Sequence, residues 1–458
     1  MYPIKIKEEN IMSVRSTPTP RRIKSKDPNR IDQTPQVDLI IIHANELVTL
    51  DSKYGIPRVG KDMKNLAIIQ DGAVAISGNS IIFVGTTEEL MTKIPSNKET
   101  IVIDATNKLV TPGFIDPHTH IIFDGNRENE LEMKLAGMTY IEILESGGGI
   151  LKTVKATRKA PLTRLIKNGR TILNRMLEYG TTSIETKSGY GLDTESEIKI
   201  LLAIKELNLE HPIDIVSTFL GAHAVPPEYE GKTDEYVEVI ISEMIPRIAK
   251  EELAEFCDVF CEEGIFSTEQ TKKILLTAIK YGIKPQIHID EIVDTNGALL
   301  ATELNAVQVG HMLKSNDEGL KALKNTETIA TLLPGTPFCL MLKDYAPARK
   351  MIEMGIPIAL ATDLNPNCWT ESMQMIIALA CYQMKLSPAE ALTAATINAA
   401  CAIERQEEIG SIEVGKKADI IVFDVPNYNF LPYQFGVNLV SKVIKNGKVV
   451  VDFEKIVK

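Results

Sequence analysis

The middle of the chain alternates short apolar runs with segments that have helical periodicity. Eight apolar runs lie between residues 111 and 408, and stretches such as 268–280, with apolar residues three or four apart, separate most of them. The first pattern is typical of buried strands and the second of amphipathic helices. The eight runs are 113–116, 181–184, 213–220, 257–261, 284–287, 306–309, 328–333 and 356–361. Strands and helices in this alternation predict an α/β fold, a (β/α)₈ TIM barrel over 111–408.

The two ends of the chain show strands joined by tight turns instead. Residues 37–110 contain strand-like runs at 37–43, 66–70, 72–78 and 80–85, and residues 409–458 contain runs at 418–424, 440–445 and 448–452. Gly78-Asn79 and Asn446-Gly447 separate adjacent runs and are hairpin signals. Neither end has enough strands to bury a sheet on both faces. We therefore predict that the two ends form one small composite β-sandwich, with the barrel inserted between them.

Residues 1–36 have the composition of a disordered tail. The stretch 15–30 is basic, rich in proline and poor in apolar residues, so it cannot bury enough surface to fold. A transit peptide is the alternative, but Glu8, Glu9, Asp27 and Asp32 argue against it.

Composition limits the functional classes. The 458 residues are 44% apolar and 24% charged, with a formal net charge of −11. A negative chain has no general attraction for nucleic acid or for an anionic membrane, and no apolar run approaches the roughly 20 residues that span a bilayer. The six cysteines are scattered without a second pair to complete a zinc site, which favours free thiols in a reducing cytoplasm. We expect a cytoplasmic protein that binds neither nucleic acid nor membrane.

Five of the seven histidines follow predicted barrel strands, where barrel enzymes place their reactive residues. The other two, His43 and His211, fit structural roles. The polar residues at strand ends are His118 and His120 after the first run, Lys187 and Tyr190 after the second, His223 after the third, His288 and Glu291 after the fifth, His311 after the sixth, and Asp363 with Asn365 after the eighth. This concentration at one end of the barrel predicts a catalytic site there.

Four of these residues form a set suited to a metal ion. His118, His120, His288 and Asp363 supply three imidazole nitrogens and one carboxylate, which suits Zn²⁺ or iron and leaves a position for water. A bound ion would lower the pKa of that water from about 16 toward about 7. Asp363 could accept the second proton as general base, although local sequence alone fits a helix N-cap equally well.

Two further residues have predicted catalytic roles. His311 could polarise a carbonyl oxygen or orient the water, and Glu291, three residues past His288, could carry protons to a ring nitrogen. The end of the fourth run reads Cys261-Glu262-Glu263 and has no lysine. A two-metal site bridged by a modified lysine is therefore not expected, and we predict one ion per chain.

The assembled residues resemble the amidohydrolase superfamily and, within it, the imidazolonepropionase family, over residues 38–455. The most specific matches are Pro112-Gly-Phe-Ile-Asp-Pro-His-Thr-His120 followed by Arg127, Lys187-Ser-Gly-Tyr-Gly-Leu192, Thr218-Phe-Leu-Gly-Ala-His-Ala-Val225, Ala361-Thr-Asp-Leu-Asn-Pro366 and Leu431-Pro-Tyr-Gln-Phe-Gly-Val-Asn438. The His-x-His pair is shared across the superfamily, whereas Lys-Ser-Gly-Tyr-Gly and Pro-Tyr-Gln-Phe-Gly-Val-Asn are particular to this family.

The resemblance implies an enzyme of histidine degradation. Such a hydrolase cleaves the ring C–N amide bond of 4-imidazolone-5-propanoate to give N-formimidoyl-L-glutamate, using one Zn²⁺ or Fe³⁺ per subunit of a homodimer. The family's residues fall here on His118, His120, His288 and Asp363 for the metal, on Arg127, Tyr190, His223, Glu291 and Asn365 for the substrate, and on His311 as a further catalytic histidine. Arg127 can pair with the propionate by two parallel hydrogen bonds, and Tyr190 and His223 can line the ring.

One departure and two alternatives bear on this hypothesis. Many family members read Asn-Pro-Gly-Ser or Asn-Pro-Gly-Thr where this chain reads Asn365-Pro-Asn367-Cys368, so a hydroxyl contact from position 368 is lost. The first alternative is another cyclic amidohydrolase or an aminohydrolase of the superfamily. The second is a non-catalytic scaffold, against which the retention of all four ligands argues.

Overall fold

The computed structural model describes residues 36–95, 98–138, 142 and 146–455. The predicted tail, 1–36, lies outside these residues except for Gln36. Within the described part of the chain, no helix is both long enough and apolar enough to cross a membrane.

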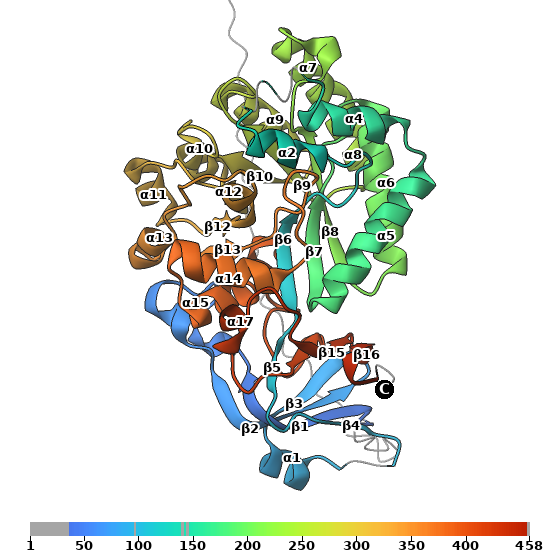
Figure 1. The fold of residues 1–458 in the computed structure, drawn as a ribbon, viewed down its shortest axis with the longest axis vertical. Helices are drawn as coiled ribbons and strands as arrows, with labels where there is room; N and C mark the ends of the chain where they lie inside the picture. The colour runs from blue at the N-terminus through green and yellow to red at the C-terminus, as the bar shows by residue number, and fades with distance from the viewer. Residues whose placement is uncertain (1–35, 96–97, 139–141, 143–145, 456–458) are drawn as a thin grey trace, which may run out of the picture. The chain divides into compact units, whose positions relative to one another are not determined.

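The predicted barrel is confirmed. Eight parallel strands of the described residues pair in the order β13-β12-β11-β10-β9-β8-β7-β6, and helices pack around them (Figure 1). Each predicted run became one strand. The strands are β6 (Phe114–Thr119), β7 (Thr181–Lys187), β8 (Asp214–Ala222), β9 (Phe256–Cys261), β10 (Lys284–Ile289), β11 (Gln308–His311), β12 (Ile329–Leu332) and β13 (Ile358–Leu360).

The helices of the described chain mostly connect or follow these strands. They are α1 (Thr87–Lys93), α2 (Asn129–Leu135), α4 (Gly149–Lys159), α5 (Leu162–Glu178), α6 (Thr194–Glu210), α7 (Thr233–Val239), α8 (Ile245–Lys250), α9 (Thr268–Lys280), α10 (Gly297–Leu304), α11 (Asp317–Leu323), α12 (Gly335–Cys339), α13 (Ala348–Met354), α14 (Met373–Met384), α15 (Pro388–Ala394), α16 (Ile397–Ala402) and α17 (Phe430–Tyr433). Helix α9 begins at a capping box, in which Ser267 and Gln270 satisfy each other's backbone N–H groups.

The barrel closes between its first and last strands. The backbone N–H of Asp363 donates to the carbonyl of His118 at 3.1 Å, and that of His120 donates to the carbonyl of Leu364 at 2.8 Å. The closing hydrogen bonds therefore lie among the predicted metal ligands themselves.

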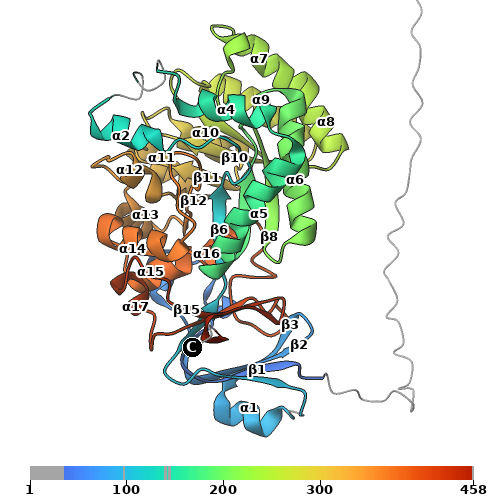
Figure 2. The same cartoon turned by 45° about the vertical axis from the view of Figure 1, so that its right-hand side comes forward.

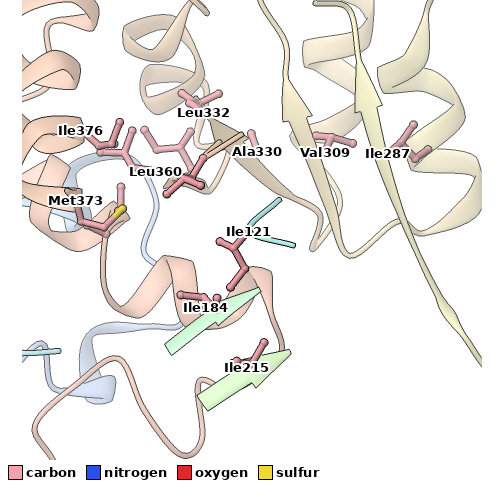
Figure 3. Close-up of a cluster of buried hydrophobic side chains, with 14 of the residues drawn as sticks. Ile121, Ile184, Ile215, Ile287, Val309, Ala330, Leu332, Leu360, Met373 and Ile376 are labelled. Atoms are coloured by element: carbon pink, nitrogen blue, oxygen red, sulfur yellow. The ribbon is translucent and has the colours of Figure 1, made fainter. Parts of the chain in front are cut away.

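Strand periodicity divides the barrel side chains between two environments. In β10, Ile287 packs outward into the large core between strands and helices, together with Ile184, Ile215, Val309 and Leu360 from other strands (Figure 3). The alternate residues of β10 are Gln286 and His288, and successive side chains of a strand point to opposite faces. The interior is layered: a separate apolar cluster that includes Ile115, Val216, Phe256, Ile329 and Ala359 fills one end of it, and polar side chains occupy the rest.

The two ends of the chain form one composite β-domain, as predicted. Its sheet runs β16-β15-β14-β5-β1-β2-β3, with β4 also paired to β1. Figures 1 and 2 both show the N-terminal and C-terminal strands together, beyond the barrel. The strands are β1 (Leu39–Val48), β2 (Ile68–Ser77), β3 (Ser80–Thr86), β4 (Ile101–Asp104), β5 (Leu109–Pro112), β14 (Ile420–Phe423), β15 (Val440–Lys445) and β16 (Lys448–Asp452).

The sheet folds over on itself, which gives it the character of a sandwich. Ile41 of β1, Ile420 of β14 and Ile444 of β15 belong to one buried cluster. The two predicted hairpin turns also meet, because a Cβ on Gly447 would lie 2.1 Å from the carbonyl oxygen of Gly78. Next to this contact, the backbone N–H of Ala418 donates to the carbonyl of Asn79 at 2.8 Å.

Details of the β-domain differ from the prediction. The runs 66–70 and 72–78 form a single strand, β2. Its pairing with β1 continues on both sides of Asp71, although this residue has a φ of 48°. Strands β4 and β5 were not predicted. Each has four residues, and β4 leaves two apolar side chains exposed, so neither shows a clear alternating pattern.

The contact between the two hairpin turns can be tested with Gly447→Ala. The added methyl would meet the carbonyl of Gly78, and the residue has a φ of 76°, so we expect a loss of about 1–3 kcal/mol in the free energy of unfolding. Gly78→Ala is the control, because it has a φ of 58° with no atom near its Cβ. Equal unfolding midpoints for the two variants would contradict the contact.

Candidate metal centre and active site

The side chains predicted to bind a metal converge at the C-terminal ends of the barrel strands. His118 lies in β6 and His120 directly follows it, His288 is the penultimate residue of β10, and Asp363 lies three residues past β13. All four are at most 3% exposed. The barrel thus brings together residues that are up to 245 positions apart in the sequence.

The donor atoms of neighbouring predicted ligands lie at distances typical of residues that bind a metal ion. Nε2 of His118 lies 3.0 Å from Nε2 of His288. Oδ1 of Asp363 lies 3.7 Å from Nε2 of His118 and 3.5 Å from Nε2 of His120. Donors about 2.1 Å from a shared tetrahedral ion are roughly 3.4 Å apart. These three distances bracket that value. His118 belongs both to a group with His120 and Asp363 and to a group with His288 and His311, and within each group the donor atoms lie within 4.8 Å of one another. The residues present therefore fit a zinc or iron ion.

The electrostatics of the site keep the imidazoles neutral and the carboxylate charged. Burial lowers the pKa of His118, His120 and His288, that of His288 to about 4, which leaves their nitrogens available as ligands at neutral pH. Burial alone would raise the pKa of Asp363. The contact with His120 and the hydrogen bond from the Thr336 hydroxyl outweigh it, so this pKa lies well below its ordinary value.

Asp363 is a constrained residue and not a helix N-cap, so that alternative is wrong. The next helix, α14, starts ten residues later and is capped by Ser372. Asp363 instead has a φ of 50°, a conformation that costs a non-glycine residue of order 1–3 kcal/mol. The hydroxyl of Thr336, in α12, donates to its Oδ2 at 2.5 Å. With this backbone conformation and the hydrogen bond from Thr336 to Oδ2, the other carboxylate oxygen, Oδ1, faces His118 and His120.

His311 and Glu291 form a second pair beside the first group. Nε2 of His311 lies 3.6 Å from Oε2 of Glu291, and its ring centroid is 5.2 Å from that of His288. One ring nitrogen each of His311, His118 and His288 lie within 4.8 Å of one another. Glu262, past β9, accepts hydrogen bonds from the backbone N–H groups of residues 291–293 and so fixes the position of Glu291.

Aromatic residues pack around His120. The His223 ring stacks on the His120 ring at 5.1 Å with 19° between their planes, and the Tyr190 ring lies 5.3 Å from that of His223. The carbonyl of Gly189 lies 3.1 Å from Nδ1 of His223. The structure therefore places both predicted ring-binding residues next to a predicted metal ligand.

The side chains of Arg127 and Asn365 make hydrogen bonds within the protein that the sequence did not predict. Nε and Nη2 of Arg127 donate to the carboxylate of Glu130 at 2.7–3.0 Å. The Asn365 side chain bridges its own loop, donating to the carbonyl of Asp363 and accepting from the backbone N–H groups of Asn367 and Cys368. Nζ of Lys134, in α2, donates to Asn367 Oδ1 at 2.6 Å.

Three residues that contact the site were not predicted from the sequence. They are Thr336, which binds Asp363, Glu262, which anchors Glu291, and Asp258, whose Oδ1 lies 3.0 Å from Nδ1 of His288. Asp258 had a signal: it is a charged residue at the centre of the apolar run 257–261, and a buried carboxylate in a strand needs a partner.

Comparison with known proteins identifies the relatives of this chain. The model of the amidohydrolase family matches residues 109–450. The chain is 50% identical to the imidazolonepropionase of Alkaliphilus metalliredigens over 424 residues, which is 92% of this chain and 100% of that protein. It is 47% identical to the imidazolonepropionase of Shouchella clausii over 416 residues, 90% and 93% of the two chains.

A solved structure supports the fold. The adenosine deaminase of Xanthomonas campestris, solved with bound zinc, has a TM-score of 0.67 and 18% identity to this chain, over 91% of this chain and 94% of that one.

The ligand set can be tested with Asp363→Asn. The amide keeps the size of the side chain but removes the charge that faces two histidines, so we expect metal content, measured by elemental analysis, to fall at least about tenfold. Asp290→Asn is the control: Asp290 is also fully buried, but it accepts hydrogen bonds from Ser315 and the loop before α10. Full metal content in the folded Asp363 variant would remove this residue from the ligands.

Proposed function

Because the chain belongs to the amidohydrolase family and, within it, to the imidazolonepropionases, we propose that it hydrolyses 4-imidazolone-5-propanoate. The bond cleaved is the ring C–N amide bond, and the product is N-formimidoyl-L-glutamate, an intermediate of histidine degradation. Identity of 50% over 92% of the chain to a protein of that activity carries this conclusion. The convergence of His118, His120, His288 and Asp363 provides the nitrogen and carboxylate donors that a metal-dependent hydrolase needs.

We propose that one Zn²⁺ or Fe³⁺ per chain is held by the three histidines and Asp363. When bound, the ion acidifies a water molecule and polarises the carbonyl that is attacked. The donor set accepts either metal. Other residues of the chain would transfer protons to and from the ring amide or bind the substrate.

When the C–N bond breaks, the ring nitrogen needs a proton, and we propose that Glu291 supplies it. Burial raises the pKa of this carboxyl, so it holds a proton more readily than an exposed glutamate. His311, 3.6 Å away, is placed to exchange a proton with it or to hydrogen-bond the carbonyl oxygen. Asp363, whose pKa lies well below its ordinary value, is the proposed fourth ligand and would accept the second proton of the water as general base.

The substrate contacts are proposed for Arg127, Tyr190, His223, Glu291 and Asn365. His223 and Tyr190 form an aromatic wall beside His120, which suits a planar ring. The guanidinium of Arg127 would bind the propionate with its remaining donor or by exchanging Glu130 for the substrate carboxylate. Asn365 would act through the loop that its side chain organises.

The rival activity is deamination or hydrolysis of another ring, as performed by other amidohydrolases. Incubation of purified protein with 4-imidazolone-5-propanoate distinguishes them: we expect loss of the substrate's absorbance and formation of N-formimidoyl-L-glutamate. No turnover of this compound, together with deamination of a purine or of cytosine, would overturn the proposal.

We further propose a cytoplasmic homodimer that acts on a small molecule and binds neither nucleic acid nor membrane. The net charge of −11 and the six free thiols fit this setting. Tyr382, Tyr433, Phe435 and Val437 are each more than half exposed, and they offer apolar surface for self-association.

The proposed domain division of the chain is a β-domain of 37–110 with 409–458 and a barrel of 111–408, preceded by the tail 1–36.

The carboxylate-binding role of Arg127 can be tested with Arg127→Met. Loss of a charged hydrogen bond of about 1.5–3 kcal/mol should raise KM by about 10–100-fold, with metal content unchanged. Arg405→Met is the matched control, because Nη2 of Arg405 donates to both carboxylate oxygens of Glu255, directly before β9 at the other end of the barrel. An unchanged KM in the Arg127 variant would remove it from this role.

A further inference from the structure

A buried lysine inside the barrel has no part in the mechanism above. Lys187, the last residue of β7, belongs to the motif Lys187-Ser-Gly-Tyr-Gly, yet its side chain is fully buried. Its Nζ lies 2.8 Å from Oε1 of Glu185, 2.9 Å from Oδ2 of Asp258 and 2.8 Å from Oε1 of Gln286. An ammonium group has three N–H donors, so these three acceptors satisfy it fully and fix its direction.

Asp258 connects this lysine to the metal centre. While its Oδ2 contacts Lys187, its Oδ1 accepts the backbone N–H of His288 at 3.1 Å. The same Oδ1 lies 3.0 Å from Nδ1 of the His288 ring, a close contact that is not aligned as a hydrogen bond. Nε2 of the same imidazole lies 3.0 Å from Nε2 of His118. The order of contacts is therefore Glu185, Lys187, Asp258, His288, and then the other ligands.

The topology makes this connection possible. Lys187 is on β7 and Asp258 is on β9, so the lysine reaches across β8, where its register partner is the small residue Thr218. Asp258 is on the strand next to β10, which carries His288. All members of the network are at most 3% exposed.

Stability does not explain such a network. Removing a lysine and two carboxylates from water costs several kcal/mol per ion, and buried ion pairs are often no more stabilising than apolar residues of the same volume. A carboxylate on the distal nitrogen of a ligating histidine, by contrast, holds the proton on that nitrogen, orients the ring and makes the other nitrogen a better donor.

We propose that Asp258 and Lys187 are positioning residues of the metal centre. Asp258 orients His288 so that Nε2 faces the ion, and Lys187 holds Asp258 in that position from inside the barrel. This inference deepens the proposed function and rests on the metal site described there. It assigns a role to the lysine of the Lys187-Ser-Gly-Tyr-Gly motif, whose three N–H donors are directed at Glu185, Asp258 and Gln286.

The chain contains a matched control for a buried lysine between two carboxylates. In the β-domain, Nζ of Lys445 lies 2.6 Å from Oδ2 of Asp419 and 2.8 Å from Oδ2 of Asp214. Lys445 and Asp419 are at most 5% exposed. Asp419→Asn and Lys445→Met therefore remove the same kinds of buried charge away from the metal ligands.

The experiment measures metal affinity rather than turnover. Metal-free full-length protein is titrated with Zn²⁺ against a chromogenic chelator, and thermal unfolding is followed in parallel. We expect Asp258→Asn to weaken Zn²⁺ binding by about 10–100-fold, the usual effect of removing such a partner. Lys187→Met should have a smaller effect in the same direction, and Asp258→Glu should restore part of the affinity. The two control variants should lose stability but bind Zn²⁺ as the wild type does.

A second readout reports on the ligand itself. Co²⁺ bound in place of Zn²⁺ has a visible spectrum that depends on its ligands, and we expect it to change in Asp258→Asn and Lys187→Met but not in the controls. If Asp258→Asn fails to fold, Lys187→Met and Asp258→Glu carry the test.

Wild-type Zn²⁺ affinity and an unchanged Co²⁺ spectrum in the folded variants would overturn the positioning role while leaving the proposed metal centre intact. Equal weakening in the control variants would also overturn it, because the effect would then be general destabilisation. Failure of the wild-type protein to bind either ion would overturn the metal centre and this inference together.

Discussion

The closure of the barrel between β6 and β13 is the constraint on which the site depends. The hydrogen bond from the backbone of Asp363 to the carbonyl of His118 both completes the barrel and sets the distance between two predicted ligands. Because Asp363 has a positive φ, its side chain turns back toward the barrel axis. Any change that opened this seam would separate the carboxylate from the histidines, so fold and metal affinity are coupled at this point.

Side chains inside the barrel also support the predicted ligands. An apolar cluster that includes Ile115 and Phe256 fills one end, and polar residues occupy the layer between it and the metal centre. A barrel that served only as a scaffold would gain more from apolar side chains in that layer. The contacts from Lys187 through Asp258 to His288 instead tie the rigid strands to one ligand, which is how a site is kept in one geometry while substrate and product exchange.

Periodicity and position predicted much of this arrangement, and pairwise contacts across the barrel account for what was not predicted. The eight strands were visible because each is a short apolar run, and the ligands because strand ends are where a barrel gathers polar side chains. Strands β4 and β5 were too short to show a pattern. The reach of Lys187 to Asp258 joins residues of two different strands and depends on side-chain directions, which no local spacing encodes. The contact of Arg127 with Glu130 is local, between residues three apart, but the spacing alone does not show that the guanidinium binds this carboxylate. Membership of the imidazolonepropionases, finally, came from the longer motifs, since the His-x-His pair alone is common to many hydrolases.

The central claim is that one ion is held by His118, His120, His288 and Asp363. Anomalous diffraction from crystals of the protein as purified, recorded above the absorption edges of zinc and iron, tests it most directly. The account predicts a single peak per chain, within about 2.0–2.3 Å of the three Nε2 atoms and a carboxylate oxygen of Asp363. Two peaks, or one peak bound by other residues, would contradict it.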